Sequence, residues 1–219
     1  MFHQVKSANE LESLVAQVGF LPFFKNEISG FSIEECTPRE LWFAKGVDGP
    51  WEWKGPVLRG KRCVYGKLFR GKTGYVSLDW LPDFANWRRQ GYDFDARYND
   101  GLVSWKDKRV FDKLDAHDSL LSTDLKLLCG DLKGFDTSLT RLQMQTYITT
   151  TDFEYCLDRH GNTYGWGIAR YATVDRHLGY DVVASAYSNA LEVSQKKILS
   201  HLEKLLPNAS PDQLLRLVG

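Results

Sequence analysis

Residues 135–171 read FDTSLTRLQMQTYITTTDFEYCLDRHGNTYGWGIARY. Apolar side chains recur at helical spacing over residues 136–146, which predicts an amphipathic helix. Residues 147–157 then alternate, with large or β-branched side chains at every second position, and residues 163–171 alternate again beyond a polar turn. The stretch therefore predicts a helix followed directly by a two-stranded β-hairpin.

Two further helices are predicted before this stretch, at residues 104–116 and 119–129. Three helices followed by a two-stranded wing is the order of a winged-helix module. In that fold the third helix enters the major groove of DNA and the hairpin touches the flanking backbone. A stable three-helix scaffold that contacts other proteins has the same order, so the order alone leaves both interpretations open.

The first half of the chain carries a similar set of signals. Ser7 and Ser32 each stand three residues before a glutamate, which is the capping box of a helix start. Gly19 is suited to end the first helix. Residues 63–69 and 75–77 have the composition of a second hairpin. These signals predict a second helix-and-hairpin unit on the N-terminal side.

We predict an α+β fold built from tandem winged-helix-like modules with a C-terminal helical segment. The first module covers residues 1–92, the second covers residues 93–178, and the helical segment covers residues 179–219. Residues 92–103 are expected to form a loop between the modules. A long amphipathic helix is expected at about residues 181–205; its apolar face suits packing within the chain, and dimerisation is the alternative.

Composition limits the class of protein. The chain has 219 residues with 28 basic and 28 acidic side chains, so its net charge is zero, and an indiscriminate nucleic-acid binder would be basic overall. The four cysteines form no C-x-x-C pair, and no apolar run approaches membrane length. We expect a cytoplasmic monomer without a metal ion or another cofactor and without a membrane partner.

Positive charge is concentrated in residues 54–77, which contain seven basic residues and no acid. Aromatic residues interleave with them, and Trp51 and Trp53 just before them would share one face of a strand. Cations with flat rings suit a polyanion-facing surface, whereas the alternative is a solvated hairpin that happens to be basic. The predicted phosphate-binding residues are Lys54, Arg59, Lys61, Arg62, Lys67, Arg70 and Lys72.

The predicted helix at 136–146 offers a second polar surface. Its apolar positions can pack inward and leave Ser138, Arg141, Gln143 and Gln145 for solvent or a ligand. Glutamine can pair with an adenine edge and arginine with a guanine edge. We therefore add Arg141, Gln143 and Gln145 to the predicted nucleic-acid-binding residues, with double-stranded DNA as the expected partner.

Three segments of the chain resemble the AlkZ-related proteins, which are small relatives of the AlkZ/YcaQ-like winged-helix DNA glycosylases. They are residues 40–84, residues 135–150 (FDTSLTRLQMQTYITT) and residues 164–179 (YGWGIARYATVDRHLG). The resemblance spans about residues 15–180. It implies tandem winged-helix modules around a DNA channel and excision of alkylated or crosslinked bases. It also implies a Gln-x-Gln or Gln-x-Asp pair in the first module that orients the hydrolytic water.

The sequence departs from that pattern at the expected position of the pair. The corresponding stretch, residues 18–27, reads VGFLPFFKNE and has no glutamine or aspartate. Gln143 and Gln145 form a Gln-x-Gln triplet in the second module, but residues two apart on a helix do not share a face. They are the catalytic candidates if a hydrolytic site has moved.

Three hypotheses follow from the sequence. The first is a nucleic-acid-binding protein that is related to DNA glycosylases and lacks their hydrolytic pair. The second is an active glycosylase with a diverged site. The third is a non-enzymatic protein-interaction module. The five histidines have no zinc-binding or metalloprotease spacing, and no phosphate-binding loop motif is present.

Overall fold

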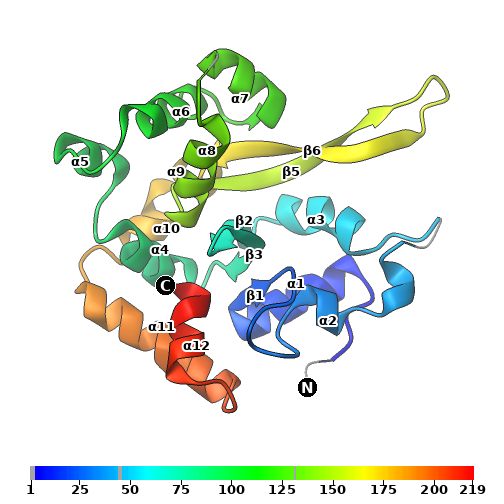
Figure 1. Ribbon diagram of the computed structural model, residues 1–219, viewed down its shortest axis with the longest axis horizontal. Coiled ribbons are helices and arrows are strands. Elements are labelled where there is room, and N and C mark those ends of the chain that lie inside the picture. The colour runs from blue at the N-terminus through cyan, green and yellow to red at the C-terminus, as the bar shows by residue number, and fades with distance from the viewer. Residues whose placement is uncertain (1–2, 44–45, 131) are drawn as a thin grey trace.

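The structure is a computed structural model that describes residues 3–43, 46–130 and 132–219 (Figure 1). It is a mixed α+β fold. Within the described residues, six strands form one antiparallel sheet in the order β1-β3-β2-β5-β6-β4. This arrangement confirms the predicted α+β class.

The N-terminal unit places a strand between its first two helices and ends in a hairpin. Its elements, in chain order, are α1 (Ala8–Val18), β1 (Phe20–Pro22), α2 (Ile33–Cys36), η1 (Arg39–Leu41), α3 (Pro50–Arg59), β2 (Cys63–Phe69) and β3 (Lys72–Ser77). The hairpin strand β3 pairs with both β1 and β2. α4 (Leu81–Arg89) and α5 (Phe94–Asn99) follow.

The next unit repeats this order and this pairing. Its elements are α6 (Trp105–Asp115), β4 (Leu120–Leu121), α7 (Ser122–Cys129), α8 (Phe135–Met144), β5 (Ile148–Leu157) and β6 (Thr163–Thr173). β6 pairs with both β4 and β5, as β3 pairs with β1 and β2. The two sheets join where Tyr65 of β2 lies opposite Thr150 of β5. The chain therefore contains the same arrangement twice, joined through corresponding strands.

Each unit's third helix contacts the other unit's strand. α3 packs on β5, and α8 packs on β2. Figure 1 shows the long β5–β6 hairpin extending from the α8 side across α3. At the α8 contact, a Cβ atom on Gly66 would lie 2.9 Å from Oε1 of Gln143, so any larger residue there would displace the Gln143 amide.

The caps read from the sequence are present. The Ser7 side chain accepts from the backbone N–H of Glu10, and that of Ser32 accepts from Glu35. Gly19 follows α1 with a φ of 79°, a conformation that favours glycine. In the β2–β3 turn, Arg70 and Gly71 both have positive φ (51° and 78°). Positive φ at two successive turn residues gives the tight turn that joins antiparallel strands.

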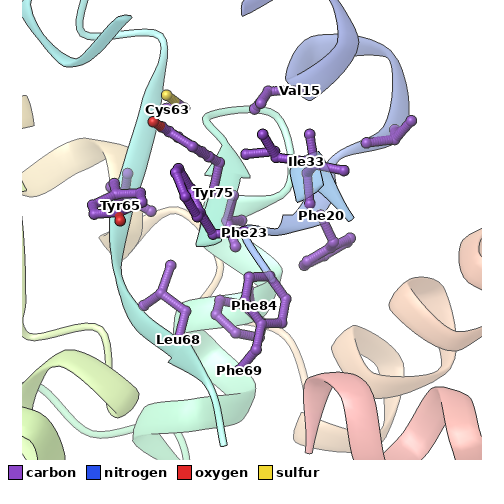
Figure 2. Packing of buried hydrophobic residues seen from close by; sticks show 14 of the residues in the cluster. Val15, Phe20, Phe23, Ile33, Cys63, Tyr65, Leu68, Phe69, Tyr75 and Phe84 are labelled. Atoms are coloured by element: carbon purple, nitrogen blue, oxygen red, sulfur yellow. The ribbon is translucent and has the colours of Figure 1, made fainter. Parts of the chain in front are cut away.

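Buried apolar residues form two clusters. The larger one unites α1, β1, β2, β3 and α4 with the C-terminal helices, and Figure 2 shows part of it around Phe20, Tyr75 and Phe84. The smaller cluster belongs to α5 through α8 and includes Phe94 and Leu142. The sheet crosses from one cluster to the other at the β2–β5 junction.

α9 (Val174–Leu178) follows β6, and the C-terminal segment contains α10 (Tyr180–Ala184), α11 (Leu191–Leu205) and α12 (Pro211–Val218). One helix at 181–205 was predicted, and the structure corrects this, because residues 185–190 interrupt it. The Asn189 carbonyl accepts from Nδ2 of Asn86 (3.2 Å) on α4, and the Asn86 amide also donates to the buried Ser194 hydroxyl (3.0 Å). α11 packs on α4 with Ile198 and Leu202 fully buried, so its apolar face is used within the chain.

Two other expectations need correction. Residues 92–103 do not form a loop throughout, because Asp93 caps α5 by accepting from the backbone N–H of Ala96 (2.7 Å). Trp51 and Trp53 lie in helix α3 rather than in a strand, with Pro50 at the first helical position. Helical spacing therefore separates the two rings: Trp53 is buried and Trp51 is half-buried.

Candidate nucleic-acid interface

The seven basic residues of the 54–77 segment do not gather on one surface. Lys54 points inward between α3 and β5, where it is 8% exposed. Its Nζ lies 3.9 Å from the ring centre of Phe153, 4.8 Å from that of Trp51 and 6.0 Å from that of Phe23. Burial lowers the pKa of Lys54 to about 8. Lys54 therefore contacts aromatic rings and is not placed to reach a phosphate.

Arg59, Lys61 and Arg62 lie at the end of α3 and in the turn that follows it. Arg59 pairs with Asp152 (2.7 Å), and Arg62 pairs with Glu12 (3.0 Å). The Lys61 ammonium donates to the His177 carbonyl (3.3 Å). These three side chains are solvent-exposed, but each already has a partner from the chain.

Arg70 and Lys72 lie at the exposed tip of the β2–β3 hairpin. They line a cavity of about 520 Å³ together with Lys25 and Arg216, which come from the segment after β1 and from α12. Sequence reasoning missed these last two residues, because they are separated from the hairpin by tens or hundreds of positions. The packing of α12 against the first unit brings Arg216 to this cavity.

A second cavity, of about 620 Å³, lies over α8. We call the exposed or half-buried residues Asp136, Thr137, Thr140, Arg141 and Met144 the α8 face. They line this α8 cavity with Arg88 and Gln145. Lys67 reaches the same face from β2, because its Nζ donates to Oγ1 of Thr140 (3.2 Å). Lys67 of the basic segment therefore contacts the helix that carries Arg141 and precedes Gln145.

Arg88 is a basic residue of this cavity that the sequence analysis did not select. Its Nη2 donates to the Leu68 carbonyl (2.6 Å), and burial lowers its pKa to about 10. Its Nε is buried and has no hydrogen-bond partner within the described residues. The sequence feature that could have identified Arg88 is the Arg88–Arg89 pair at the end of α4. Adjacent positions on a helix face different sides, so the two arginines have different surroundings.

The two glutamines of the Gln-x-Gln triplet lie in different environments, as their helical spacing predicts. Gln143 is 2% exposed. Its Oε1 accepts from the backbone N–H of Lys67 (3.0 Å) and its Nε2 donates to the Leu139 carbonyl (3.2 Å). Gln145 is half-buried and lines the α8 cavity. Gln143 and the buried Ser138 therefore hold the fold together, and Gln145 is the one open to a ligand.

Arg141 combines a structural contact with exposure. Its Nη1 donates to Oδ2 of Asp107 (2.7 Å), a carboxylate whose side chain is 3% exposed, while the Arg141 side chain itself is 46% exposed. Because a guanidinium has five N–H donors, this pairing leaves donors of Arg141 on the open side. The α8 face therefore keeps a positive group that is held in one orientation.

Nearly the whole chain matches one protein family. Residues 5–219 match the AlkZ-related family (AlkZ-rel, "AlkZ related"). The chain belongs to the AlkZ-related family. No curated protein and no solved structure matches it. Membership confirms the resemblance on which part of the sequence analysis rested and relates the chain to AlkZ-like DNA glycosylases.

In this AlkZ-related chain, the stretch 18–27 passes through β1 and lies mostly in the core. Phe20, Leu21 and Phe23 are fully buried, and Phe24 is the first exposed side chain after them. Buried apolar side chains cannot orient a water molecule.

No cluster of histidine, cysteine, aspartate or glutamate suited to a metal ion occurs in the described residues, and no helix among them is long and apolar enough to cross a membrane.

Proposed function

We propose that this AlkZ-related protein binds double-stranded DNA through the α8 face. The order α6–β4–α7–α8–β5–β6, with β4 paired to β6, supports a winged-helix module whose third helix is α8 and whose wing is the β5–β6 hairpin. In winged-helix proteins the third helix enters the major groove. The N-terminal unit has the same order, which supports the tandem arrangement.

The observation that carries the proposal is the chemistry of the α8 face. Arg88, Lys67 and Arg141 supply positive charge around a helix surface that also carries the hydroxyls of Thr137 and Thr140. Asp136 is the one acid that lines the cavity among the described residues. Cations can hold phosphates, while hydroxyl and amide groups can reach base edges.

The proposal predicts a modest dependence on salt. Three cations that neutralise three phosphates give a slope of log K against log salt of roughly −3 for a duplex, at about −0.9 per phosphate. An affinity that does not change with salt, or one that falls with salt much more steeply than this slope, would contradict an interface centred on Lys67, Arg88 and Arg141. Fluorescence polarisation of a labelled duplex across several salt concentrations measures the slope.

A single substitution tests the face without disturbing the fold. Thr137→Glu places a carboxylate on the exposed first turn of α8, where the helix dipole favours it. The variant is expected to fold normally and to bind duplex at least fivefold more weakly. Gln17→Glu, at an exposed position on α1, is the matched control and should bind like the wild type. Equal affinity of all three proteins would overturn the proposal.

The geometry supports binding over base excision. The first-unit stretch that would carry the hydrolytic pair is apolar and largely buried, and both polar ends of the Gln143 amide are already bonded to the backbone. We expect no abasic product when alkylated duplex is incubated with the protein and then treated with alkali. Product that appears with the wild type and disappears with Gln145→Ala would instead establish excision at the α8 cavity.

A further inference from the structure

Two cavities meet on the N-terminal unit, away from the α8 face. The first, which we call the basic cavity, has a volume of about 520 Å³ and contains the cations Lys25, Arg70, Lys72 and Arg216. The second, which we call the aromatic cavity, has a volume of about 470 Å³. Phe24 and Lys25 line both, so the cavities lie on either side of these two residues, and neither shares a lining residue with the α8 cavity.

The charge of the two cavities favours an anion. Five basic and two acidic residues line them, a net charge of +3. Glu27 is paired with Arg216 (2.9 Å), and the Glu34 carboxylate accepts from the backbone N–H of Lys25 (2.9 Å). Within the described residues, the Lys25, Arg70 and Lys72 side chains have no carboxylate partner. Three cations of the basic cavity are therefore available to a ligand, and Arg39 of the aromatic cavity also has no carboxylate partner among the described residues.

Rings from three segments line the aromatic cavity. They are Phe24, Trp42, Phe43 and Trp51. The Trp42 and Trp51 rings meet edge to face at 5.7 Å, and the Phe24 ring is 6.0 Å from that of Trp51. Phe43 is 82% exposed and has a free ring face to offer. Lys54 supports Trp51 from the interior, with its ammonium 4.8 Å from the ring centre.

Rings beside unpaired cations match the chemistry of an unpaired nucleic-acid strand. Bases of a single strand expose both faces and can stack on aromatic side chains while basic residues hold the phosphates, whereas bases in a duplex are already stacked and paired. We propose that the aromatic and basic cavities together bind single-stranded nucleic acid, with bases on the rings of Phe43 and its neighbours and phosphates at Lys25, Arg70 and Lys72.

Anisotropy of a labelled dT oligomer of about 12 nucleotides, within the site sizes of single-strand-binding folds, tests the basic cavity. The wild type is expected to bind with a log–log salt slope of roughly −2, from three phosphates at about −0.7 each. Arg70→Glu combined with Lys72→Glu, both exposed and unpaired, should weaken binding at least tenfold. Lys113→Glu, an exposed lysine on α6, is the matched control and should change it less than twofold.

The aromatic cavity is tested separately by removing bases or rings. An abasic oligomer of equal length keeps every phosphate and should bind the wild type at least fivefold more weakly than the dT oligomer. Phe43→Ala, at an exposed position, should weaken dT binding about fivefold and leave binding of the abasic oligomer unchanged. Equal binding of the two oligomers would show an anion site alone and overturn the proposal.

The outcomes separate this site from the duplex site. Thr137→Glu should reduce duplex binding and leave dT binding intact, while the Arg70/Lys72 double variant should do the reverse. Duplex binding without dT binding overturns the single-strand site only, and dT binding without duplex binding overturns the proposed function only. Loss of dT binding in Lys113→Glu to the same extent as in the double variant would show that the effect is general charge, against a site at the hairpin tip.

Discussion

α3 and α8 hold equivalent places in two units of the same design, yet the residues that they bury and expose differ in kind. In α3 most residues are buried, including Lys54. In α8 the α8 face is exposed or half-buried, and Arg141 reaches solvent. The same order of elements therefore gives a helix that buries a lysine among aromatic rings in one unit and a helix with threonines and an arginine on its uncovered side in the other.

The difference comes from the side chains that each helix carries, because the elements that cover the two helices are equivalent. α3 packs against both α1 and β5, and it carries Trp53, Val57 and Leu58 to fill those contacts. α8 packs against α6 and β2, and the α8 face on its remaining side consists of two threonines, an arginine, an aspartate and a methionine. The order of elements thus does not determine what a third helix offers to a ligand; the side chains on its uncovered side do.

The largest expected effect tests how firmly the two units are locked together. Arg89 of α4 is 1% exposed and donates to the Thr146 carbonyl (2.7 Å) after α8 and to the Tyr187 hydroxyl (2.7 Å) of the C-terminal segment. Arg89→Met leaves these groups and Asp175 without their cation. We expect a loss of about 3–5 kcal/mol in the free energy of unfolding. Urea denaturation measures it.

Arg176→Met is the control for that substitution, because Arg176 also pairs with an aspartate but is 44% exposed. It should cost under about 1 kcal/mol. If the two variants unfold at the same urea concentration, Arg89 does not join the units.

The next effect has the opposite sign and tests whether α3 is a structural helix. A buried lysine ammonium destabilises the folded state because it is desolvated. Lys54→Met should therefore raise the free energy of unfolding at pH 7 by about 1–3 kcal/mol, a net value that includes the loss of the cation–π contacts. Binding of duplex DNA should not change. Lys6→Met, at an exposed lysine, should stay within about 0.5 kcal/mol of the wild type.

The advantage of Lys54→Met should depend on pH. The folded-state pKa of Lys54, about 8, lies below its ordinary value of 10.5, so the unfolded chain binds more protons between these values. Stability of the wild type therefore rises with pH across this window relative to the variant. Denaturation at pH 7 and pH 10 should show the gap shrinking; a gap that is constant with pH would mean that Lys54 is not held charged in a desolvated site.

A smaller effect distinguishes two glutamines on the open helix. Gln143→Ala removes the acceptor for the backbone N–H of Lys67 and should cost about 2 kcal/mol, because a buried donor is left unpaired. Gln145→Ala should cost no more than about 0.5 kcal/mol and instead weaken duplex binding. Thermal unfolding with a polarisation titration measures both. Equal destabilisation would remove the distinction between the inner and outer sides of α8.

The smallest effect concerns a cation from the basic segment that lies outside both proposed sites. Arg62 is 77% exposed and paired with Glu12, so Arg62→Ala should cost less than about 0.5 kcal/mol. It should also leave duplex and dT binding within twofold of the wild type, with Glu12→Ala as the matched partner variant. A fall in affinity comparable to that of Thr137→Glu would extend the DNA-binding surface to the α3 end of the molecule.

Local sequence signals predicted most of the elements. The caps at Ser7 and Ser32, the hairpin at β2–β3 and the three helices before the β5–β6 hairpin lie close to where the patterns placed them. These features depend on neighbouring residues, whose hydrogen bonds and side-chain periodicity are fixed by short sequence separations. The break at 185–190 was missed; within it the Asn189 carbonyl accepts a hydrogen bond from Asn86, a contact across about a hundred residues that no local pattern shows.

The exposure and the partners of the predicted basic residues could be read from the sequence only in part, again because distant segments decide them. Arg70 and Lys72 are adjacent at a turn, and their exposure follows from the turn itself. Whether Arg59 or Arg62 is free depends on Asp152 and Glu12, which no local pattern connects to them. Charge density along the chain therefore identified basic residues but could not identify which of them lack partners.

The sequence by itself determined the repeated order of helices and strands and the membership of the AlkZ-related family. Capping, periodicity and motif order depend on residues that lie close together in the sequence. The tertiary structure alone decided that Lys54 faces aromatic rings, that Arg88 joins α8, and that Lys25 and Arg216 meet the hairpin tip. Contacts between distant segments set burial and ion pairing, and burial and pairing decide which charges a ligand can reach.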